Sequence, residues 1–209
     1  MIFLDNNVLI GYIFETDRWN SKACTVMKCD IKKFSSDTVC KECSDIYEKK
    51  VRIIKSEIRL TIRKLNNFKS FKSNKISSFI AQFNIKEIIT KFFEANSNSS
   101  IKELSDGLRK LQRDMESRCL QNLSNIREVV SIHKRDKSYK EIYQLFQADG
   151  LVEIDSVDVE IILDAHHVGL EVNGLFLISG DYKHIISKKE VIIRNTSLKN
   201  VIGLGEFNP

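Results

Sequence analysis

The sequence predicts an α/β protein whose parallel sheet is built from both ends of the chain, with a large α-helical insertion between them. Short apolar runs that suit buried strands occur near both termini, as Ile2-Phe3-Leu4 and as Leu175-Phe176-Leu177-Ile178. Between about residues 38 and 148 the chain has no proline and one glycine, which is typical of helices. Short strands that alternate with helices favour a parallel sheet.

The first 48 residues predict two strands and the start of a long helix. A polar turn containing Asp5 follows the strand at residues 2–4, and Val8-Leu9-Ile10 then begins a helix. A second strand near residues 33–35 runs into Ser36-Asp37-Thr38, any of which can cap the next helix.

The middle of the chain predicts a basic helical insertion over residues 49–149. The Phe68 to Lys75 stretch is expected to interrupt the first helix, and residues 95–100 form a loop. Ser100 and Glu103 make a capping box for a helix over residues 101–132, and a short helix follows at residues 139–147. Residues 45–150 hold 22 Lys and Arg against 13 Asp and Glu, so this part is strongly basic.

The last part of the chain returns to α/β character and completes the sheet domain, which we assign to residues 1–48 and 150–209. A helix is expected at residues 157–170, and strands at residues 174–179 and 190–193. Residues 151–209 hold 5 Lys and Arg against 9 Asp and Glu. A basic region that attracts a polyanion and an acidic region that gathers carboxylates are therefore present in one chain.

Composition and cysteine pattern predict a soluble cytoplasmic protein without a membrane segment. No apolar run is long enough to span a bilayer, and the N-terminus lacks the features of a signal peptide. Zinc binding is one reading of a C-x4-C-x10-C-x2-C pattern, formed by Cys24, Cys29, Cys40 and Cys43. Small buried hydrophobic residues are the better interpretation, because the final C-x2-C brackets a glutamate on a predicted helix.

Two aspartates follow predicted strands at the edge where functional groups gather in a parallel sheet. Asp5 follows Ile2-Phe3-Leu4, and Asp181 follows Leu177-Ile178-Ser179-Gly180. The crevice outside the carboxyl ends of the strands is the usual ligand site of such sheets. If the two strands are neighbours, both carboxylates lie in one crevice.

Four segments, in this order, resemble the PIN-domain nucleases. They are FLDNNVLI with Asp5, FSSDTVCKE with Glu42, SVDVEIILDA with Asp158 and Ala165, and FLISGD with Asp181. The resemblance covers about residues 1–48 and 152–200 and implies a PIN-like, Rossmann-like three-layer domain. It also implies a metal-dependent ribonuclease whose acids bind one or two Mg²⁺ or Mn²⁺ ions. The long insertion departs from the compact family pattern, so the substrate does not carry over.

We therefore expect four acids to be catalytic and to hold the metal: Asp5, Glu42, Asp158 and Asp181. Hard divalent cations prefer oxygen ligands, and a bound ion can activate water for hydrolysis of RNA. These acids also have structural alternatives. Asp5 can cap the helix that follows it, Asp158 lies in a first helical turn where the helix dipole favours any acid, and Glu42 can be a solvated helix residue with Glu48 as its substitute.

Further residues are candidates for reserve or supporting roles in the same site. Asp155 is expected to cap its helix and Asp164 to point to another flank, and both are reserve ligands. The resemblance points to Asn7 as a supporting residue, and Ser36 and Ser179 are strand-end hydroxyls that can orient the ligands or steady the turn.

The basic insertion supplies candidate nucleic-acid contacts on one helical face, namely Arg52, Lys55, Arg59 and Arg63. The resulting hypothesis is a PIN-like ribonuclease that cleaves RNA endonucleolytically, with a homodimer or an inhibitory protein partner as further possibilities. Two alternatives remain open. One is a structure-selective DNA or RNA nuclease with a helical clamp, and the other is a non-catalytic module that binds nucleic acid or a partner.

Overall fold

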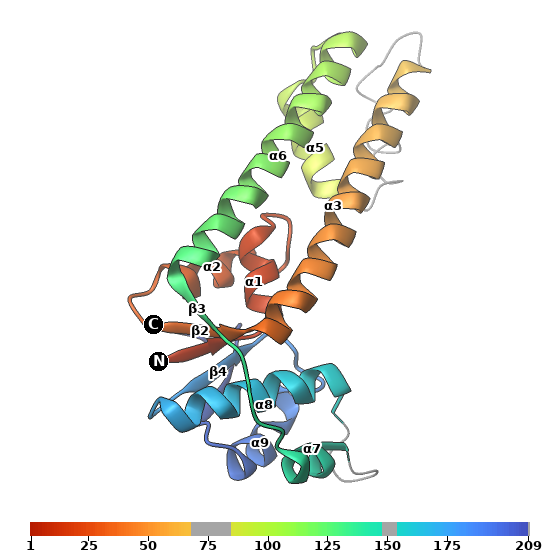
Figure 1. The fold of residues 1–209 in the computed structure, drawn as a ribbon. Helices are drawn as coiled ribbons and strands as arrows, with labels where there is room; N and C mark the ends of the chain where they lie inside the picture. Colours follow the sequence, from red (N-terminus) through yellow and green to blue (C-terminus); the bar gives the residue numbers. More distant parts are fainter. Residues whose placement is uncertain (68–84, 148–153, 209) are drawn as a thin grey trace. The chain divides into compact units, whose positions relative to one another are not determined.

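The computed structural model describes residues 1–67, 85–147 and 154–208, in which short strands alternate with helices (Figure 1). In chain order the elements are β1 (Ile2–Leu4), α1 (Asn6–Ile13), α2 (Asn20–Lys28), β2 (Lys33–Ser36), α3 (Asp37–Asn66), α5 (Lys86–Ala95), α6 (Ile101–Val129), β3 (Val130–His133), α7 (Lys140–Gln147), α8 (Ser156–Glu171), β4 (Phe176–Ser179), the 3₁₀ turn η2 (Ile186–Lys188), α9 (Lys189–Asn195) and β5 (Asn200–Gly203).

The strands of the described residues form one parallel five-stranded sheet in the order β3-β2-β1-β4-β5. In the centre of the sheet, Phe3 of β1 lies opposite Phe34 of β2, and Leu4 lies opposite Ile178 of β4. The α/β class, the parallel sheet and its assembly from both chain ends with long helices between are confirmed.

The chain divides into two compact units. Unit 1 contains residues Met1–Ile46 and Asn122–Pro209, and unit 2 contains Tyr47–Gln121. The expected insertion covers residues 49–149, whereas β3 and α7 belong to the unit that contains the sheet.

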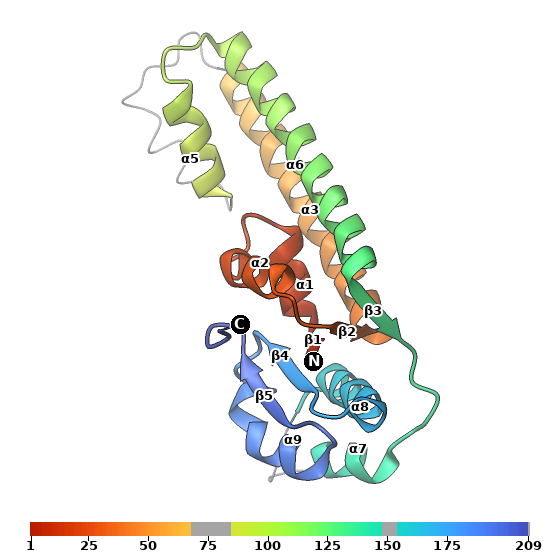
Figure 2. The same cartoon turned by 90° about the vertical axis from the view of Figure 1, so that its left-hand side faces the viewer.

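The order of the strands in unit 1 creates a switch point between β1 and β4. From β1 the chain moves to β2 and β3 on one side, then returns to β4 and β5 on the other side. Helices α1 and α2 lie over one face of the sheet, and α8 and α9 lie over the opposite face (Figure 2). In open sheets of this kind, ligands bind outside the carboxyl ends of the strands at the switch point.

The central strands are buried on both faces, as expected for a parallel sheet covered by helices. Phe3 and Leu4 of β1, and Leu177 and Ile178 of β4, have no exposed surface. Burial of this apolar core fixes the strands rigidly, so the residues that directly follow β1 and β4 are held at defined positions.

Unit 2 is helical and has an apolar seam of its own. Along α3 its buried positions are Ile54, Ile58, Thr61 and Leu65, a spacing of four, three and four residues that keeps one face of the helix inward. A Cβ atom on Gly107 of α6 would lie 2.9 Å from the ring of Phe92 in α5. The one glycine of the insertion is thus explained by a close helix contact.

Two secondary-structure predictions were wrong. Residues 130–132 were expected to continue a helix, but α6 ends at Val129 and β3 follows, because the short segment VSIH gains backbone pairing with β2. Residues 190–193 were expected to form a strand but belong to α9, and β5 comes later at Asn200–Gly203. A four-residue apolar run does not distinguish a strand from a helix.

Other local predictions are confirmed. Of the three candidate caps at residues 36–38, Ser36 is the one that caps α3, since its Oγ accepts from the backbone N–H of Val39 at 3.3 Å. Ser100 and Glu103 form the capping box of α6 as predicted. The predicted interruption at residues 68–75 lies outside the described residues. In the ranges that the structure covers, every helix is too short or too polar to traverse a lipid bilayer.

Candidate functional site

Asp5 lies at the carboxyl end of β1 and is buried, with 1% of its surface exposed. Its Oδ1 accepts from the backbone N–H of Asn6 at 2.5 Å, and its Oδ2 accepts from Asn7 Nδ2 at 3.1 Å and from Ser179 Oγ at 2.6 Å. Burial raises the pKa of Asp5 above its ordinary value, while these three hydrogen bonds oppose the shift. Asp5 therefore caps α1, and its carboxylate is fixed at the switch point by three hydrogen bonds.

Ser179 at the end of β4 joins the two candidate aspartates. Its hydroxyl donates to Asp5 and accepts from the backbone N–H of Asp181 at 2.9 Å. Asp181 Oδ1 in turn accepts from the backbone N–H of His184 at 2.8 Å. The Ser179 hydroxyl therefore has contacts of the kind that its predicted role in steadying the Asp181 turn requires, and it also bonds to the residue that follows β1.

Trp19, which was not among the predicted site residues, lies against the turn between Ser179 and Asp181. A Cβ atom on Gly180 would lie 2.8 Å from Trp19 Nε1 and 3.0 Å from the Cβ of Asn7. Within the described residues, Trp19 Nε1 is buried and has no hydrogen-bond partner. The sequence gives no signal for this contact, because a lone tryptophan in a loop has no characteristic spacing.

Glu42 extends from the second turn of α3 and carries an unpaired oxygen. Its Oε2 is buried and has no hydrogen-bond partner among the described residues. Burial raises the pKa of Glu42, and the negative charges of Asp5, Asp155 and Asp181 raise it further, while a hydrogen bond from the Asn6 side chain opposes the shift. Both asparagines of the first turn thus serve carboxylates, since Asn7 binds Asp5 and Asn6 binds Glu42.

Asp158 lies in the first turn of α8, and Asp155 caps that helix by accepting from the backbone N–H of Val157 at 3.0 Å. Burial raises the pKa of Asp158 to about 8, and the negative charges of four neighbouring carboxylates add to the effect, namely Asp5, Asp181, Asp155 and Glu42. The predicted acids are therefore within electrostatic range of one another.

We define the acidic cluster as Asp5, Glu42, Asp155, Asp158 and Asp181. The charged groups that shift the pKa values of Asp5, Glu42 and Asp158 are all carboxylates. Among residues 1–67, 85–147 and 154–208, no Lys or Arg forms an ion pair with a member of the cluster. Negative charge gathered at a switch point without a protein cation favours an external cation.

The donors of the acidic cluster suit a hard divalent cation. All of them are carboxylate oxygens, and Glu42 Oε2 is buried without a partner in the described part of the chain. A complete cage is not formed, because no three His, Cys, Asp or Glu side chains of the described residues are arranged to hold an ion. Mg²⁺ commonly takes one or two carboxylates and completes its shell with water and substrate phosphates. The cluster fits that mode of binding.

The reserve ligand Asp164 has a different partner. It is 4% exposed, and its Oδ1 accepts from Arg135 Nε at 2.8 Å. Arg135 also forms an ion pair with Glu160. Asp164 does not contribute to the pKa shifts of the acidic cluster. It is therefore accounted for by Arg135, whereas the other reserve residue, Asp155, lies with the cluster.

The four cysteines of the C-x4-C-x10-C-x2-C pattern are free thiols. Cys29 Sγ donates to the backbone carbonyl of Val26 at 3.0 Å, and burial raises the pKa of Cys43 to about 12. Zinc is bound by thiolates, which a raised pKa disfavours. These contacts support the interpretation of the cysteines as small buried or half-buried residues.

The predicted nucleic-acid residues of α3 separate into two pairs. Arg52 lies 3.9 Å from Glu48, and Lys55 Nζ lies 3.0 Å from Glu116 Oε2, so both have acidic partners. Arg59 and Arg63 instead line a groove together with Arg109 and Arg113 of α6, which the sequence analysis did not single out. The four-residue spacing within each pair indicates that its two arginines share a helical face, but it does not indicate that the faces of α3 and α6 meet.

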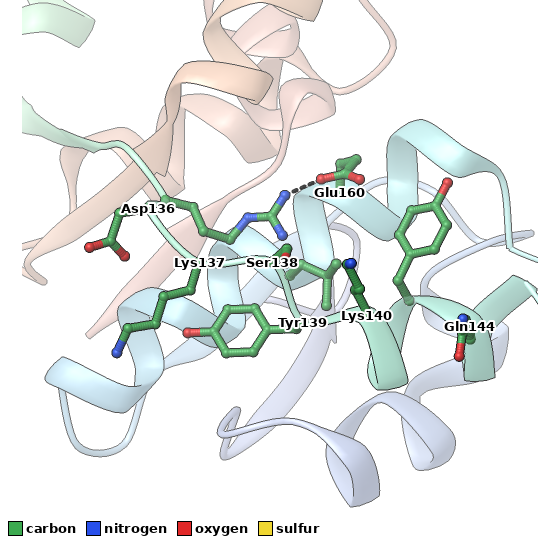
Figure 3. A pocket seen from close by; sticks show the side chains of 10 residues that line it. Asp136, Lys137, Ser138, Tyr139, Lys140, Gln144 and Glu160 are labelled. Atoms are coloured by element: carbon green, nitrogen blue, oxygen red, sulfur yellow. Dashed lines mark hydrogen bonds and ion pairs between the residues drawn. The ribbon is translucent and has the colours of Figure 1, made fainter.

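A second hollow lies in unit 1 beside α7 and α8 (Figure 3). It has a volume of about 430 Å³, and Tyr139, Lys140, Gln144 and Glu160 are among the side chains around it. The ion pair that ends at Glu160 in this view comes from Arg135. No member of the acidic cluster lines this pocket among the described residues, so it is a separate feature.

Comparison with known proteins adds no further information on the acidic cluster. No protein-family model matches the chain, and no curated protein or solved structure matches it either. The function is therefore inferred from the position of the cluster at the switch point, its charge and its hydrogen bonds.

Proposed function

We propose that this chain is a nuclease that hydrolyses RNA phosphodiester bonds with the help of Mg²⁺ or Mn²⁺, endonucleolytically. One observation carries the proposal: the carboxylates that follow β1 and β4 and those of α3 and α8 gather at the switch point, where burial and neighbouring negative charges raise the pKa values of Asp5, Glu42 and Asp158. No Lys or Arg of the described residues forms an ion pair with them. The same four acids carry the sequence resemblance to PIN-domain nucleases.

Each acid has a role that follows from its contacts. Asp5 and Asp181 would hold the cation, because Ser179 links them and backbone N–H groups fix their orientation. Glu42, whose Oε2 has no described partner, and Asp158 would add negative charge beside the ion, and the raised pKa of Asp158 would fall as positive charge arrives. The bound ion would polarise the phosphate and lower the pKa of an attacking water.

A second candidate function is a nucleic-acid-binding module that does not catalyse hydrolysis. The absence of a three-ligand arrangement among the described His, Cys, Asp and Glu side chains favours it. The two functions differ in one observable property, because only a nuclease turns over RNA when a divalent cation is present.

The test is cleavage of an end-labelled single-stranded RNA in Mn²⁺, in Mg²⁺ and in EDTA. We expect Asp5→Asn and Asp181→Asn each to lower the rate by more than about 100-fold, since changes one shell beyond a metal ligand already cost about 10–100-fold. Asp45→Asn is the matched control, because Asp45 is exposed on α3 and lies outside the acidic cluster.

Circular dichroism establishes that each variant is folded. Equal cleavage in EDTA, or in both cluster variants, contradicts the nuclease proposal. RNA binding without turnover in any divalent cation supports the binding module instead.

A further inference from the structure

A groove in unit 2 gathers arginine side chains from two helices. It has a volume of about 490 Å³, and its described lining includes Arg59 and Arg63 of α3 and Arg109 and Arg113 of α6. Amide side chains supply two further lining residues, and Ile62 is the single apolar residue in the described lining. A lining in which four of the seven described residues are arginines offers many hydrogen-bond donors to an anion.

Two polar contacts fix the helices that form this groove. Lys55 Nζ lies 3.0 Å from Glu116 Oε2, and Ser105 Oγ donates to Asn66 Oδ1 at 3.1 Å. The number of residues from Lys55 to Asn66 on α3 equals the number from Ser105 to Glu116 on α6. Because the first residue of one helix pairs with the last of the other, the two helices run antiparallel. At 1.5 Å per residue the contacts are about 16 Å apart, and the four arginines lie between or beside them.

The guanidinium groups of the groove are available to a ligand. All four arginines are exposed. Arg63 and Arg113 have no acidic partner among the described residues, whereas Arg109 binds Asp106 at 2.7 Å and Arg59 lies within electrostatic range of Glu116. Two of the four positive charges are therefore not balanced by a described neighbour.

The unit that contains this groove is strongly basic. Residues Tyr47–Gln121 hold 17 Lys and Arg against 8 Asp and Glu, a formal net charge of +9 that exceeds the +5 of the whole chain. Guanidinium groups bind phosphate oxygens through two parallel hydrogen bonds, which makes paired arginines well suited to a phosphate backbone.

We propose that the arginine groove binds the phosphate backbone of a single-stranded nucleic acid. Four arginines and a single apolar residue in the described lining favour a polyanionic backbone over a peptide that relies on several apolar side-chain anchors. A volume of about 490 Å³ suits a short stretch of one strand rather than a duplex. That the strand is RNA rests on the proposed function, while phosphate binding by the groove does not.

The experiment measures binding of a labelled 20-nucleotide single-stranded RNA to the full chain by fluorescence anisotropy in EDTA, where metal-dependent cleavage cannot occur. We expect the double variant Arg63→Gln/Arg113→Gln to weaken binding about tenfold at 0.1 M salt. The slope of log K against log salt concentration should also fall by about 1.4, which corresponds to two lost phosphate contacts on a single strand.

Arg52→Gln is the matched control, since Arg52 is exposed on α3 but is paired with Glu48 and does not line the groove. We expect it to change affinity less than twofold. The proposal is overturned if the double variant binds RNA as the unaltered chain does, or if Arg52→Gln weakens binding equally. It is also overturned if a polyglutamate peptide displaces the labelled RNA at a lower concentration than unlabelled RNA does.

Failure of the groove and failure of the nuclease proposal have different signatures. Loss of groove binding would leave the rate at saturating RNA and its dependence on Asp5 unchanged. Absence of cleavage in Mn²⁺ with intact, arginine-dependent binding would contradict the nuclease proposal and leave the groove in place.

Discussion

Two aspartates of α8, Asp164 and Asp158, lie on one helix in opposite electrostatic settings. Asp164 is almost fully buried and is neutralised by Arg135, whose Nε donates to it at 2.8 Å. Asp158 is only partly buried, yet its pKa is raised to about 8, because burial is reinforced by the negative charges of four carboxylates.

Asp164 is a structural carboxylate with a cationic partner, whereas ionisation of Asp158 is unfavourable in the folded chain. A buried carboxylate with an arginine partner stabilises the fold, and its charge needs nothing from solvent. Carboxylates that face only other carboxylates destabilise the folded chain when they are ionised. Such an arrangement is expected where a ligand cation later supplies the missing charge.

Removing Arg135 should leave the negative charge of Asp164 without a cationic partner. Arg135→Met leaves Asp164 buried without its cation, so we expect the free energy of unfolding to fall by about 3–5 kcal/mol, as for other broken buried ion pairs. Urea unfolding followed by circular dichroism measures this loss.

The double variant Arg135→Met/Asp164→Leu tests the cause, since it removes the charge that would be left unpaired. It should regain most of the lost stability. If Arg135→Met unfolds at the same urea concentration as the unaltered chain, the pair does not neutralise Asp164 as described.

Much of the fold was predictable because its signals are local. The apolar runs of β1 and β4, the Ser36 cap and the capping box of α6 depend on residues that are close in sequence. β3 was missed because its formation depends on pairing with β2, almost a hundred residues earlier in the chain. A segment such as VSIH carries too few apolar residues to indicate a strand.

The acidic cluster was predictable at its strand ends and less so on its helices. Asp5 and Asp181 follow two buried strands. In a parallel sheet, residues that follow the strands lie at the same edge, where their carboxyl ends meet. The arginine partner of Asp164 comes from a loop that follows β3, and no periodicity in the sequence connects the two. The arginines of α6 were missed because the sequence does not show which face of α6 meets α3.

The Ser179 hydroxyl positions two residues of the acidic cluster, Asp5 and Asp181, so its removal tests how their positions affect activity. Ser179→Ala loses the hydrogen bond to Asp5 Oδ2 and the one from the backbone N–H of Asp181. We expect the rate of RNA cleavage in Mn²⁺ to fall by about 10–100-fold, as for other residues that orient metal ligands.

Ser35→Ala is the matched control for Ser179→Ala. Ser35 is another buried serine of the sheet, and its hydroxyl donates to the backbone carbonyl of Leu4 at 2.9 Å rather than to a carboxylate. Both variants lose buried hydrogen bonds, but only Ser179→Ala should lose activity beyond what a small loss of stability explains. Equal rates in the two variants would contradict a positioning role for Ser179.

The smallest expected effect is a gain in stability from neutralising Asp158. Its carboxyl has a pKa of about 8 in the folded chain, against an ordinary value of 3.8. Below about pH 4 the group is protonated in both states, and its contribution to stability is fully present. As the pH rises toward 8 the unfolded chain has already lost the proton that the folded chain keeps, so stability falls.

Asp158→Asn should remove that pH-dependent loss in EDTA. Because Asp158 is partly exposed, screening reduces the expected gain at pH 8 to about 1 kcal/mol, or roughly 2–4 °C in melting temperature, with no gain at pH 4. Mn²⁺ should reverse the order at pH 8, since a cation that binds the folded state stabilises the unaltered chain more than the variant. A variant that melts below the unaltered chain in EDTA at pH 8 would mean that the Asp158 carboxylate already has a stabilising partner, and the contrast with Asp164 would then disappear.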